Sequence, residues 1–272
     1  MRQQSQEPLS VTFVGTATTL LHLGPFTLLT DPNFLHAGQR AYLGYGLSSR
    51  RRTNPAIEID DLPQLDAVLL SHLHGDHFDR VARDRLPRAV PILTTPHAKR
   101  RLRRSGFVAA SGLSTWESQV LHRDGHLLRV TAVPAQHGPA GVHRLLPPTM
   151  GSIVDLEQAG VRQLRLYVTG DTLYRPWLVQ VAQRFPDIDA TLVHLGGTRI
   201  LGILVTMDGA QGAELATTVP SRLTLPIHYD DYGVFRSPLS DFLDAVRKRG
   251  VADRIRVLER GQTMSLAPAA RP

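Results

Sequence analysis

A single nine-residue stretch, Ser71 to Asp79, constrains this chain more than any other feature of its sequence. It follows the apolar run Ala67 to Leu70, which is typical of a buried strand, and it places three histidines and one aspartate in six positions. Imidazole nitrogens suit zinc and its first-row neighbours, and a carboxylate adds a charged oxygen. Such a cluster at a strand end predicts a metal site rather than a polar loop with chance histidines.

The spacing within this stretch suggests two directions for the side chains. His72 and His74 are two residues apart, so on an extended chain they point to the same side. Asp76 and His77 follow Gly75, which allows the backbone to turn and to direct them elsewhere. One strand end can therefore supply two ligands to one metal ion and two to a second.

Composition limits which other groups can take part. The chain has no cysteine, which excludes disulfides and thiolate ligands and leaves His, Asp and Glu to bind a metal. Its formal net charge is +7, and arginine carries nearly all of the positive charge because Lys99 and Lys248 are the only lysines. A basic balance suggests phosphorylated or otherwise anionic partners, although an arginine-rich solvated surface is the simpler explanation.

The length of 272 residues allows one large domain or two small ones. No linker rich in Gly, Pro or Ser separates the two halves, so we expect residues 1–272 to form a single domain. Met1 to Ser10 is polar and lacks the apolar segment of a signal peptide, and no apolar run approaches the roughly 20 residues that span a membrane. We therefore expect a cytoplasmic protein without a membrane span, and the oligomeric state stays open.

Hydrophobic periodicity and turn residues predict alternating strands and helices. The expected strands are 11–14, 18–23, 26–30, 67–70, 89–94, 127–133, 152–156, 165–168, 190–195, 222–227, 255–258 and 264–266. The expected helices are 80–86, 97–104, 175–185, 207–219 and 237–249, the last with Ser237 as its N-cap and Pro238 in the first helical position.

Residues 34–62 show no convincing periodicity and are expected to form a long loop. Loops of this length inside a compact domain are usually functional or disordered, so we expect a lid or a segment that contacts substrate. Its triplet Arg50 to Arg52 offers guanidinium groups that match phosphate oxygens, and the alternative is a solvated run of charge.

Polar motifs also follow other expected strands. They are Gly15-Thr16-Ala17-Thr18, Thr30-Asp31-Pro32, Pro134 to Gly138 with His137, Thr169 to Thr172 with Asp171, and Pro226 to Asp230 with His228. Together with Ser71 to Asp79 they resemble the signature of the metallo-β-lactamase superfamily, from Val11 to about Val246. The first two resemble the branch of the ascorbate-6-phosphate lactonases and N-acyl-phosphatidylethanolamine phospholipases D. Those relatives usually carry a histidine where this chain has Thr16, and the effect of that change stays open.

The resemblance implies an α/β protein, a four-layer αβ/βα sandwich of the metallo-β-lactamase fold, with two divalent metal ions between its sheets. By resemblance His72, His74 and His137 would hold the first ion, Asp76, His77 and His228 the second, and Asp171 would bridge them. We interpret Asp31 as the acceptor of a hydrogen bond near these ligands, and the alternative is a simple Asp-Pro turn. Zinc is the expected metal, and manganese or iron are alternatives because all three accept nitrogen and oxygen ligands.

A metal-dependent hydrolase follows from the resemblance, in which a hydroxide held by two metals cleaves a phosphodiester, ester or lactone of a small-molecule substrate, phosphorylated or anionic ones included. Asp76 and Asp171 would be the catalytic carboxylates. The alternatives are an RNA- or DNA-processing nuclease of the same superfamily, with nucleic acid as partner, and a non-catalytic metal-binding regulatory domain. Redox chemistry at a di-iron centre is a third reading, but it usually needs a flavin domain that this chain lacks.

Overall fold

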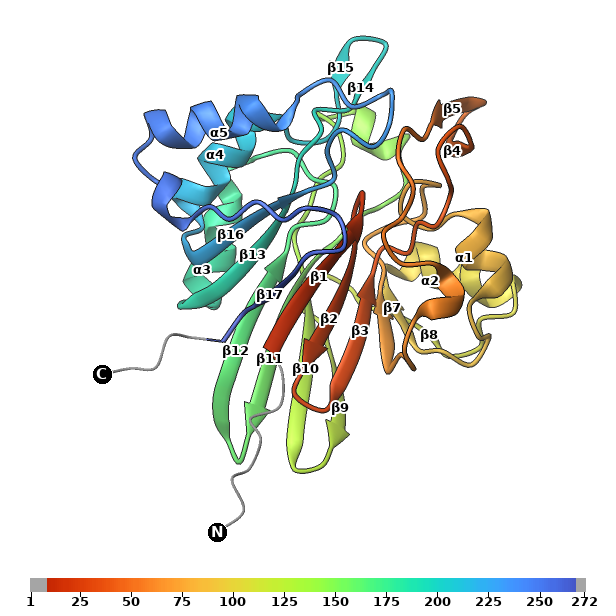
Figure 1. Cartoon of the computed structure of the whole chain (residues 1–272), viewed down its shortest axis with the longest axis vertical. Coiled ribbons are helices and arrows are strands. Elements are labelled where there is room, and N and C mark those ends of the chain that lie inside the picture. Colours follow the sequence, from red (N-terminus) through yellow and green to blue (C-terminus); the bar gives the residue numbers. More distant parts are fainter. Residues whose placement is uncertain (1–8, 268–272) are drawn as a thin grey trace.

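Two β-sheets face one another at the centre of the molecule, and helices cover their outer faces (Figure 1). The computed structural model describes residues 9–267, so residues 1–8, on which most of the signal-peptide expectation rests, lie outside the described residues. The α/β class and the αβ/βα layering expected from the sequence are confirmed. Within residues 9–267, no helix is both long and apolar enough to cross a membrane.

The first sheet combines both ends of the chain with the segment around the histidine cluster. Its order is β17 (Thr263–Ser265), β1 (Leu9–Gly15), β2 (Thr18–Leu23), β3 (Phe26–Thr30), β6 (Ala67–Leu69), β7 (Ile92–Thr94) and β8 (Ala110–Gly112). Pairing is antiparallel from β17 to β3 and parallel from β3 to β8. Helices α1 (Arg80–Arg85) and α2 (Pro96–Arg104) lie beside its parallel half (Figure 1).

The second sheet is continuous in sequence apart from its helical crossovers. Its order is β16 (Ser221–Ile227), β13 (Ile188–His194), β12 (Val161–Val168), β11 (Gly151–Gln158), β10 (His126–Val133) and β9 (Ser118–Arg123). The strands β12, β13 and β16 are parallel, so their carboxyl ends meet at one edge of the sheet. The outer face is covered by α3 (Val179–Arg184), α4 (Gly209–Thr218) and α5 (Leu239–Lys248).

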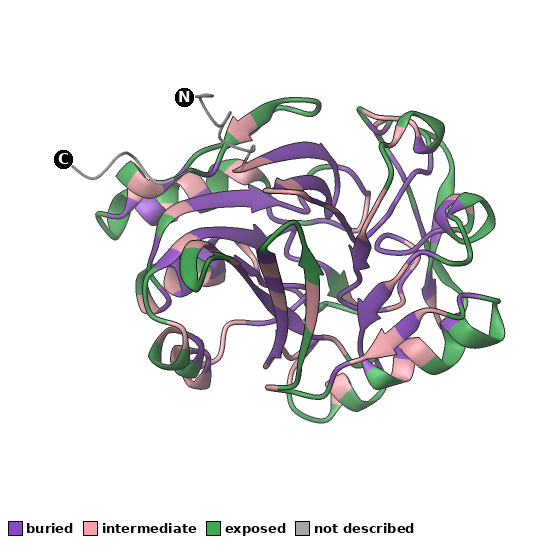
Figure 2. Cartoon of the chain, turned by 90° about the horizontal axis from the view of Figure 1, so that it is seen from below, coloured by how far each residue is buried: buried purple, intermediate pink, exposed green. Residues whose placement is uncertain are grey.

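The main core lies between the two sheets. Phe13 and Leu21 of the first sheet share one buried cluster with Val130 and Leu192 of the second. A second cluster joins the second sheet to α3–α5, and a third joins the first sheet to α1 and α2. Because both faces of each sheet are covered, the central strands are buried almost along their whole length (Figure 2).

Two small hairpins project at the end of the molecule where the carboxyl ends of the parallel strands meet (Figure 1). They are β4 (Arg40–Gly44) with β5 (Leu47–Arg50), and β14 (Arg199–Ile200) with β15 (Ile203–Leu204). The expected loop over residues 34–62 is therefore wrong in part, because it contains the first hairpin and a 3₁₀ turn at Ile59–Asp61. Only Ala41 and Leu43 of β4 are buried, which is too short an alternation to recognise in sequence.

Other expectations at element boundaries also need correction. Residues 255–258 form no strand, and only an isolated bridge joins Ile255 to Thr224. The short or exposed strands β8 and β9 were not predicted. Ser237 is not the N-cap of α5, whose N-cap is Pro238; the Ser237 hydroxyl instead accepts a hydrogen bond from the Gly209 N–H at the start of α4.

Candidate metal centre

Seven side chains from four strand ends meet between the two sheets. The structure brings together all the residues that the sequence motifs singled out, namely His72, His74, Asp76, His77, His137, Asp171 and His228. They follow β6, β10, β12 and β16, and none is more than 7% exposed. Their nitrogen and oxygen atoms form overlapping groups in which all atoms lie within 4.8 Å of one another. The side chains therefore form one connected cluster.

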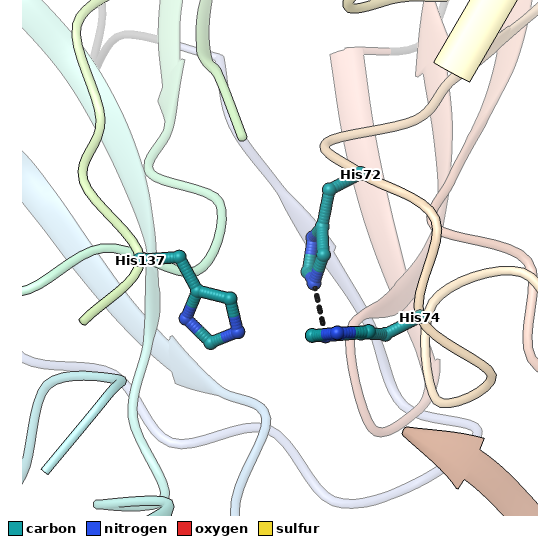
Figure 3. A group of neighbouring side chains, drawn as sticks. All are labelled: His72, His74 and His137. Atoms are coloured by element: carbon teal, nitrogen blue, oxygen red, sulfur yellow. Dashed lines mark hydrogen bonds between the residues drawn. The ribbon is translucent and has the colours of Figure 1, made fainter. Parts of the chain in front are cut away.

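The first group within this cluster consists of three histidines, His72, His74 and His137 (Figure 3). The distance from His72 Nε2 to His74 Nδ1 is 3.0 Å, and the His137 ring faces both from the opposite side. His137 Nδ1 donates to the carbonyl oxygen of Val205 at 2.8 Å, which leaves Nε2 to point into the group. Three imidazoles thus direct nitrogen atoms at one point.

The second group consists of Asp76, His77 and His228. Asp76 Oδ2 lies 3.5 Å from His228 Nε2 and 4.0 Å from His77 Nε2. His228 Nδ1 contacts the carbonyl oxygen of Leu195 at 2.9 Å, so this ring too is oriented by a backbone acceptor. The His228 backbone has φ of 61°, a left-handed conformation that is uncommon for a side chain of this size, and its N–H donates to the Thr16 carbonyl.

Asp171 lies between the two groups. Its Oδ2 is 3.4 Å from His77 Nε2 and its Oδ1 is 3.5 Å from His228 Nδ1, and it also groups with His72. The hydroxyl of Thr206 donates to Oδ2 at 2.9 Å and holds the carboxylate in this orientation. A single carboxylate therefore reaches histidines of both groups.

The fit of this donor set to metal ions shows in its buried atoms that have no hydrogen-bond partner in the described part of the chain. Among residues 9–267, buried atoms without a hydrogen-bond partner include His74 Nε2, Asp76 Oδ1, His77 Nε2, Asp171 Oδ1 and His228 Nε2. Burying a polar atom without a hydrogen-bond partner lowers the stability of the folded chain. Five such atoms in one cluster of side chains therefore need a common explanation. Nitrogen and carboxylate oxygen donors in this arrangement fit divalent metal ions.

Asp31 lies behind the second group and connects it to the sheet. Its Oδ1 accepts a hydrogen bond from the Ser71 N–H at 2.7 Å, and its Oδ2 lies 3.2 Å from His77 Nδ1 and 3.3 Å from His194 Nε2. Burial raises the pKa of Asp31, but the charge of His77 and hydrogen bonds from both histidines outweigh burial and lower it to about 2. An ionised Asp31 orients His77, as expected for a hydrogen-bond acceptor near the cluster.

Electrostatics divide the histidines into two kinds. Burial, followed by the charges of neighbouring histidines, lowers the pKa of His72 well below its usual range and that of His74 to about 3. Burial also lowers the pKa of His137. For His77 and His228 burial acts in the same direction, but the carboxylate of Asp171 and its acidic neighbours outweigh it and raise both pKa values.

Several residues that hold the cluster in place were not found from the sequence. Asn33 donates through Nδ2 to the Gly75 carbonyl at 2.9 Å, and its Oδ1 accepts from Tyr232 Oη at 3.0 Å and from Arg51. It therefore joins the loop of the histidine stretch to the loop that follows His228. A lone asparagine after Asp31-Pro32 gives no local signal of such a role, because its partners are distant in sequence.

The expectation that the triplet Arg50 to Arg52 offers its guanidinium groups to phosphate is wrong for Arg51. Arg51 is fully buried and donates to the Asn33 backbone carbonyl at 2.8 Å, whereas Arg50 and Arg52 are exposed. The three guanidinium groups therefore cannot act together on a substrate. Arg51 instead supports the loop that Asn33 organises.

Thr16, where the family resemblance leads us to expect a histidine, is hydrogen-bonded through its backbone to His228. Its N–H donates to Asp231 Oδ2 at 2.9 Å and its carbonyl accepts from the His228 N–H at 2.6 Å. Its hydroxyl is buried and has no partner among the described residues. The backbone of Thr16 thus holds His228 in position, and this contact does not depend on the side chain of Thr16.

Comparisons with known proteins identify the family of this chain. A family model described as "Beta-lactamase superfamily domain" matches residues 27–229. The chain is 30% identical over 244 residues to N-acyl-phosphatidylethanolamine-hydrolyzing phospholipase D 1 of Caenorhabditis elegans, a match that covers 84% of this chain but only 65% of that protein. It is 25% identical to the UPF0173 protein YddR of Bacillus subtilis, over 94% of this chain and 99% of that one.

A solved structure confirms the fold. The crystal structure of a possible metal-dependent hydrolase from Veillonella parvula superposes with a TM-score of 0.79 at 23% identity. The match covers 95% of this chain and 99% of that chain.

Proposed function

The chain belongs to the family described as the beta-lactamase superfamily domain, and from this premise we propose that it is a metal-dependent hydrolase. The proposed reaction is cleavage of a phosphodiester, ester or lactone at a site with two divalent ions. The observation that carries the proposal is the convergence of seven buried histidine and aspartate side chains, five of which have a nitrogen or oxygen atom without a hydrogen-bond partner in residues 9–267.

In this proposal the three histidines His72, His74 and His137 hold one ion, and Asp76, His77 and His228 hold the other. Asp171 contributes to both, since its two oxygens lie near histidines of different groups. Zinc is the proposed metal, with manganese and iron as alternatives that the same donors accept. Bound there, divalent ions supply a water of lowered pKa and polarise the electrophile.

The chain's own residues perform the remaining tasks. Val205 and Leu195 each accept a hydrogen bond from a ring nitrogen, which fixes the tautomers of His137 and His228. Asp76 would bind the second ion through one carboxylate oxygen, which would leave its other oxygen to take a proton from a water molecule and pass it to the leaving group. Burial of the whole cluster strengthens these interactions because it excludes bulk water.

The surroundings of His74 favour a substrate with a phosphate. A cavity of about 250 Å³ adjoins His74 and is lined by Arg40, Arg80 and Arg83. One guanidinium group can bind two phosphate oxygens at once through two N–H groups. We therefore assign to these arginines the phosphate binding that the sequence suggested for Arg50 to Arg52. The Caenorhabditis elegans relative is named for hydrolysing N-acyl-phosphatidylethanolamine, which agrees with a phosphodiester as the first substrate class to test.

The test combines metal content with turnover. Protein reconstituted with zinc, manganese or iron is analysed for bound metal and assayed against bis(p-nitrophenyl) phosphate, a lactone, a β-lactam and RNA. We expect two ions per chain and turnover of the phosphodiester. At most one ion at saturation would overturn the two-metal site, and two ions without turnover of any substrate would favour a regulatory metal-binding domain.

The cavity arginines give a separate prediction about substrate choice. Replacing Arg40 and Arg80 by alanine should raise KM for a phosphodiester roughly tenfold or more while kcat changes little, because a phosphate contact away from the reacting atoms stabilises ground and transition states alike. Arg50→Ala is the matched control, because Arg50 is exposed and does not line this cavity. An equal change in KM for a neutral lactone would contradict the role in phosphate binding.

A further inference from the structure

Exposed apolar side chains gather at the end of the molecule that carries the metal centre. Nine large hydrophobic side chains are exposed among residues 9–267. Six of them lie on three segments, residues 36–54, 138–150 and 196–206, which we call the rim segments. These six are Tyr42, Tyr45, Leu47, Leu145, Leu201 and Ile203. The hairpins β4–β5 and β14–β15 form the tips of two of these segments (Figure 1).

The rim segments are tied to one another and to the metal centre. Tyr45 Oη donates to the Leu145 carbonyl at 2.6 Å, which joins the first segment to the second. The Gly138 N–H donates to the Val205 carbonyl at 2.8 Å, which joins the second to the third. That same carbonyl accepts from His137 Nδ1. The three segments are therefore parts of one end of the molecule.

The turns of the hairpins show that the apolar tips are not a requirement of the fold. Four hairpins have two-residue turns in which both residues have positive φ, the geometry of type I′ turns. The two at the opposite end carry Asp124-Gly125 and Ala159-Gly160. The two on the rim carry Tyr45-Gly46 and Leu201-Gly202 instead.

Leucine is unfavourable at this turn position for two reasons. Leu201 has φ of 49°, where asparagine, aspartate and glycine are preferred, and its side chain is 95% exposed. Tyr45 repeats the combination with φ of 50° and 73% exposure. Neither side chain gains burial in the folded chain that would offset this backbone conformation. Tyr45 does gain one hydrogen bond within the chain, to the Leu145 carbonyl, and contact with something outside the chain would account for Leu201 and for the exposed ring of Tyr45.

Charge on the rim indicates what that contact is. The three rim segments contain no aspartate or glutamate. They do contain exposed arginines, including Arg40, Arg144 and Arg199. Exposed leucine and tyrosine tips next to arginines match a surface that is apolar inside and negatively charged at its boundary. A second copy seated on the same rim would place arginines opposite arginines, which opposes such a dimer.

We propose that the rim segments dock onto an anionic lipid surface, with the side chains of Leu201, Tyr45 and Leu145 inserted at the boundary of the acyl chains. The arginines of the same segments contact lipid phosphates. The metal centre then lies at the end that faces the lipid surface, because Val205 of the third segment accepts a hydrogen bond from His137 and Tyr42 of the first accepts one from Gly75. This docking depends on the surface alone and does not require the proposed hydrolase activity.

The experiment measures binding to vesicles by flotation, without any assay of turnover. One set of vesicles contains phosphatidylcholine with phosphatidylglycerol, and the other contains phosphatidylcholine alone. Wild-type protein should float with the anionic vesicles, less at high salt, and hardly at all with the neutral ones. Leu201→Asn should reduce binding roughly tenfold, because it removes one inserted leucine side chain. Arg144→Gln should weaken binding and flatten its salt dependence.

Two controls separate docking from general attraction by a basic protein. Ala159→Asn makes the same change of turn residue at the opposite end, and it should leave vesicle binding unchanged. Replacing Arg101 and Arg104 on α2, a basic helix that buries its Leu102, should also have little effect. Leu201→Asn should fold at least as stably as wild type, since asparagine is preferred at the turn, and thermal unfolding checks this.

The proposal is overturned if wild-type protein does not float with anionic vesicles, or if Leu201→Asn binds them as well as wild type does. It is also overturned if the α2 variant loses binding while Arg144→Gln retains it, because the basic surface of α2 would then be responsible. A wild-type dimer that Leu201→Asn converts to a monomer, without an effect on vesicle binding, would show a second copy as the occupant of the rim.

Discussion

Asp171 lies next to histidines of both groups, although it comes from a different sheet than His72 and His77. Its position depends on the Thr206 hydroxyl, which donates to Oδ2 and leaves Oδ1 without a partner among the described residues. It follows a strand end and does not belong to a hydrophobic core cluster of the described chain. Its side chain can therefore be removed without opening the core.

The first prediction concerns this carboxylate. Asp171→Ala should lower kcat by about three orders of magnitude and reduce the bound metal below two ions, because both ions would share its oxygens. Metal-free Asp171→Ala should still unfold cooperatively, but at a lower temperature than metal-free wild type, because the buried carboxylate that raises the pKa values of His77 and His228 is lost. The control is Asp187→Ala, which replaces an exposed aspartate near the start of β13 and should change neither kcat nor the amount of bound metal. Wild-type turnover in Asp171→Ala would remove it from the proposed site.

The second prediction follows from the protonation of the histidines. In the metal-free protein neighbouring carboxylates, which outweigh burial, raise the pKa of His77 well above its usual value and also raise that of His228, so His77 holds a proton near neutral pH and His228 is protonated to a larger extent than a free imidazole. Metal ligands must be neutral, so binding has to release about one to two protons, and affinity should fall as pH falls below the raised pKa values.

This release can be measured by calorimetry in two buffers with different ionisation enthalpies. The pKa values of His72, His74 and His137 are lowered, so these rings are already neutral and should release none. The first ion should therefore bind with little dependence on pH and the second with strong dependence. Binding heats that are identical in both buffers for both ions would contradict the assignment of His77 and His228 as ligands.

At the scale of elements, the β4–β5 hairpin packs directly against the turn of the histidine stretch. The Gly75 N–H donates to the Tyr42 carbonyl at 2.9 Å. A Cβ atom at Gly75 would lie 2.7 Å from the backbone nitrogen and oxygen of Tyr42, a distance that real Cβ atoms do not adopt. Glycine is needed here because two backbones meet, and the hairpin in turn holds the turn between His74 and Asp76.

The third prediction tests this contact. Gly75→Ala should displace β4 and the Asp76 side of the cluster, with a loss of the second ion and a destabilisation of about 1–3 kcal/mol. Gly233→Ala is a matched control, since the nearest side-chain atoms lie 3.8 Å or more from its would-be Cβ. Metal analysis and urea unfolding report the two effects. Full metal content in Gly75→Ala would show that the hairpin does not position the site.

At the scale of the whole molecule, the two halves of the chain share one core. Side chains of the first sheet, from both chain ends, pack with those of the second sheet in a single cluster. The C-terminal strand β17 pairs with β1, so the chain ends lie in the same sheet. On these grounds we propose that the chain is one domain that unfolds as a unit.

The fourth prediction is a single cooperative transition in urea. Trp116 and Trp177 both pack in the cluster of the second sheet, so tryptophan fluorescence reports on that half alone. Far-UV circular dichroism reports on both halves. The two curves should coincide in protein stripped of metal by a chelator. Circular dichroism that changes at a lower urea concentration than fluorescence would instead indicate two separately folding halves.

The sequence by itself determined the strand ends and the residue types that follow them. The hairpin at 18–30 was predicted with its final boundaries, and His72 and His74 were expected on one side of the chain. These features are local, because hydrophobic periodicity, turn residues and spacing act within a few residues. The order of the motifs along the chain, through its family resemblance, also led to the grouping of His137, Asp171 and His228 with them.

Only the tertiary structure decided how distant segments meet. It showed that Arg51 is buried, that Asn33 joins the loops beside His77 and His228, and that the apolar hairpin tips share the end that carries the metal centre. Their partners lie tens to hundreds of residues away along the chain. No local pattern encodes such contacts, because they depend on how the two sheets pack and on which side chains that packing removes from water.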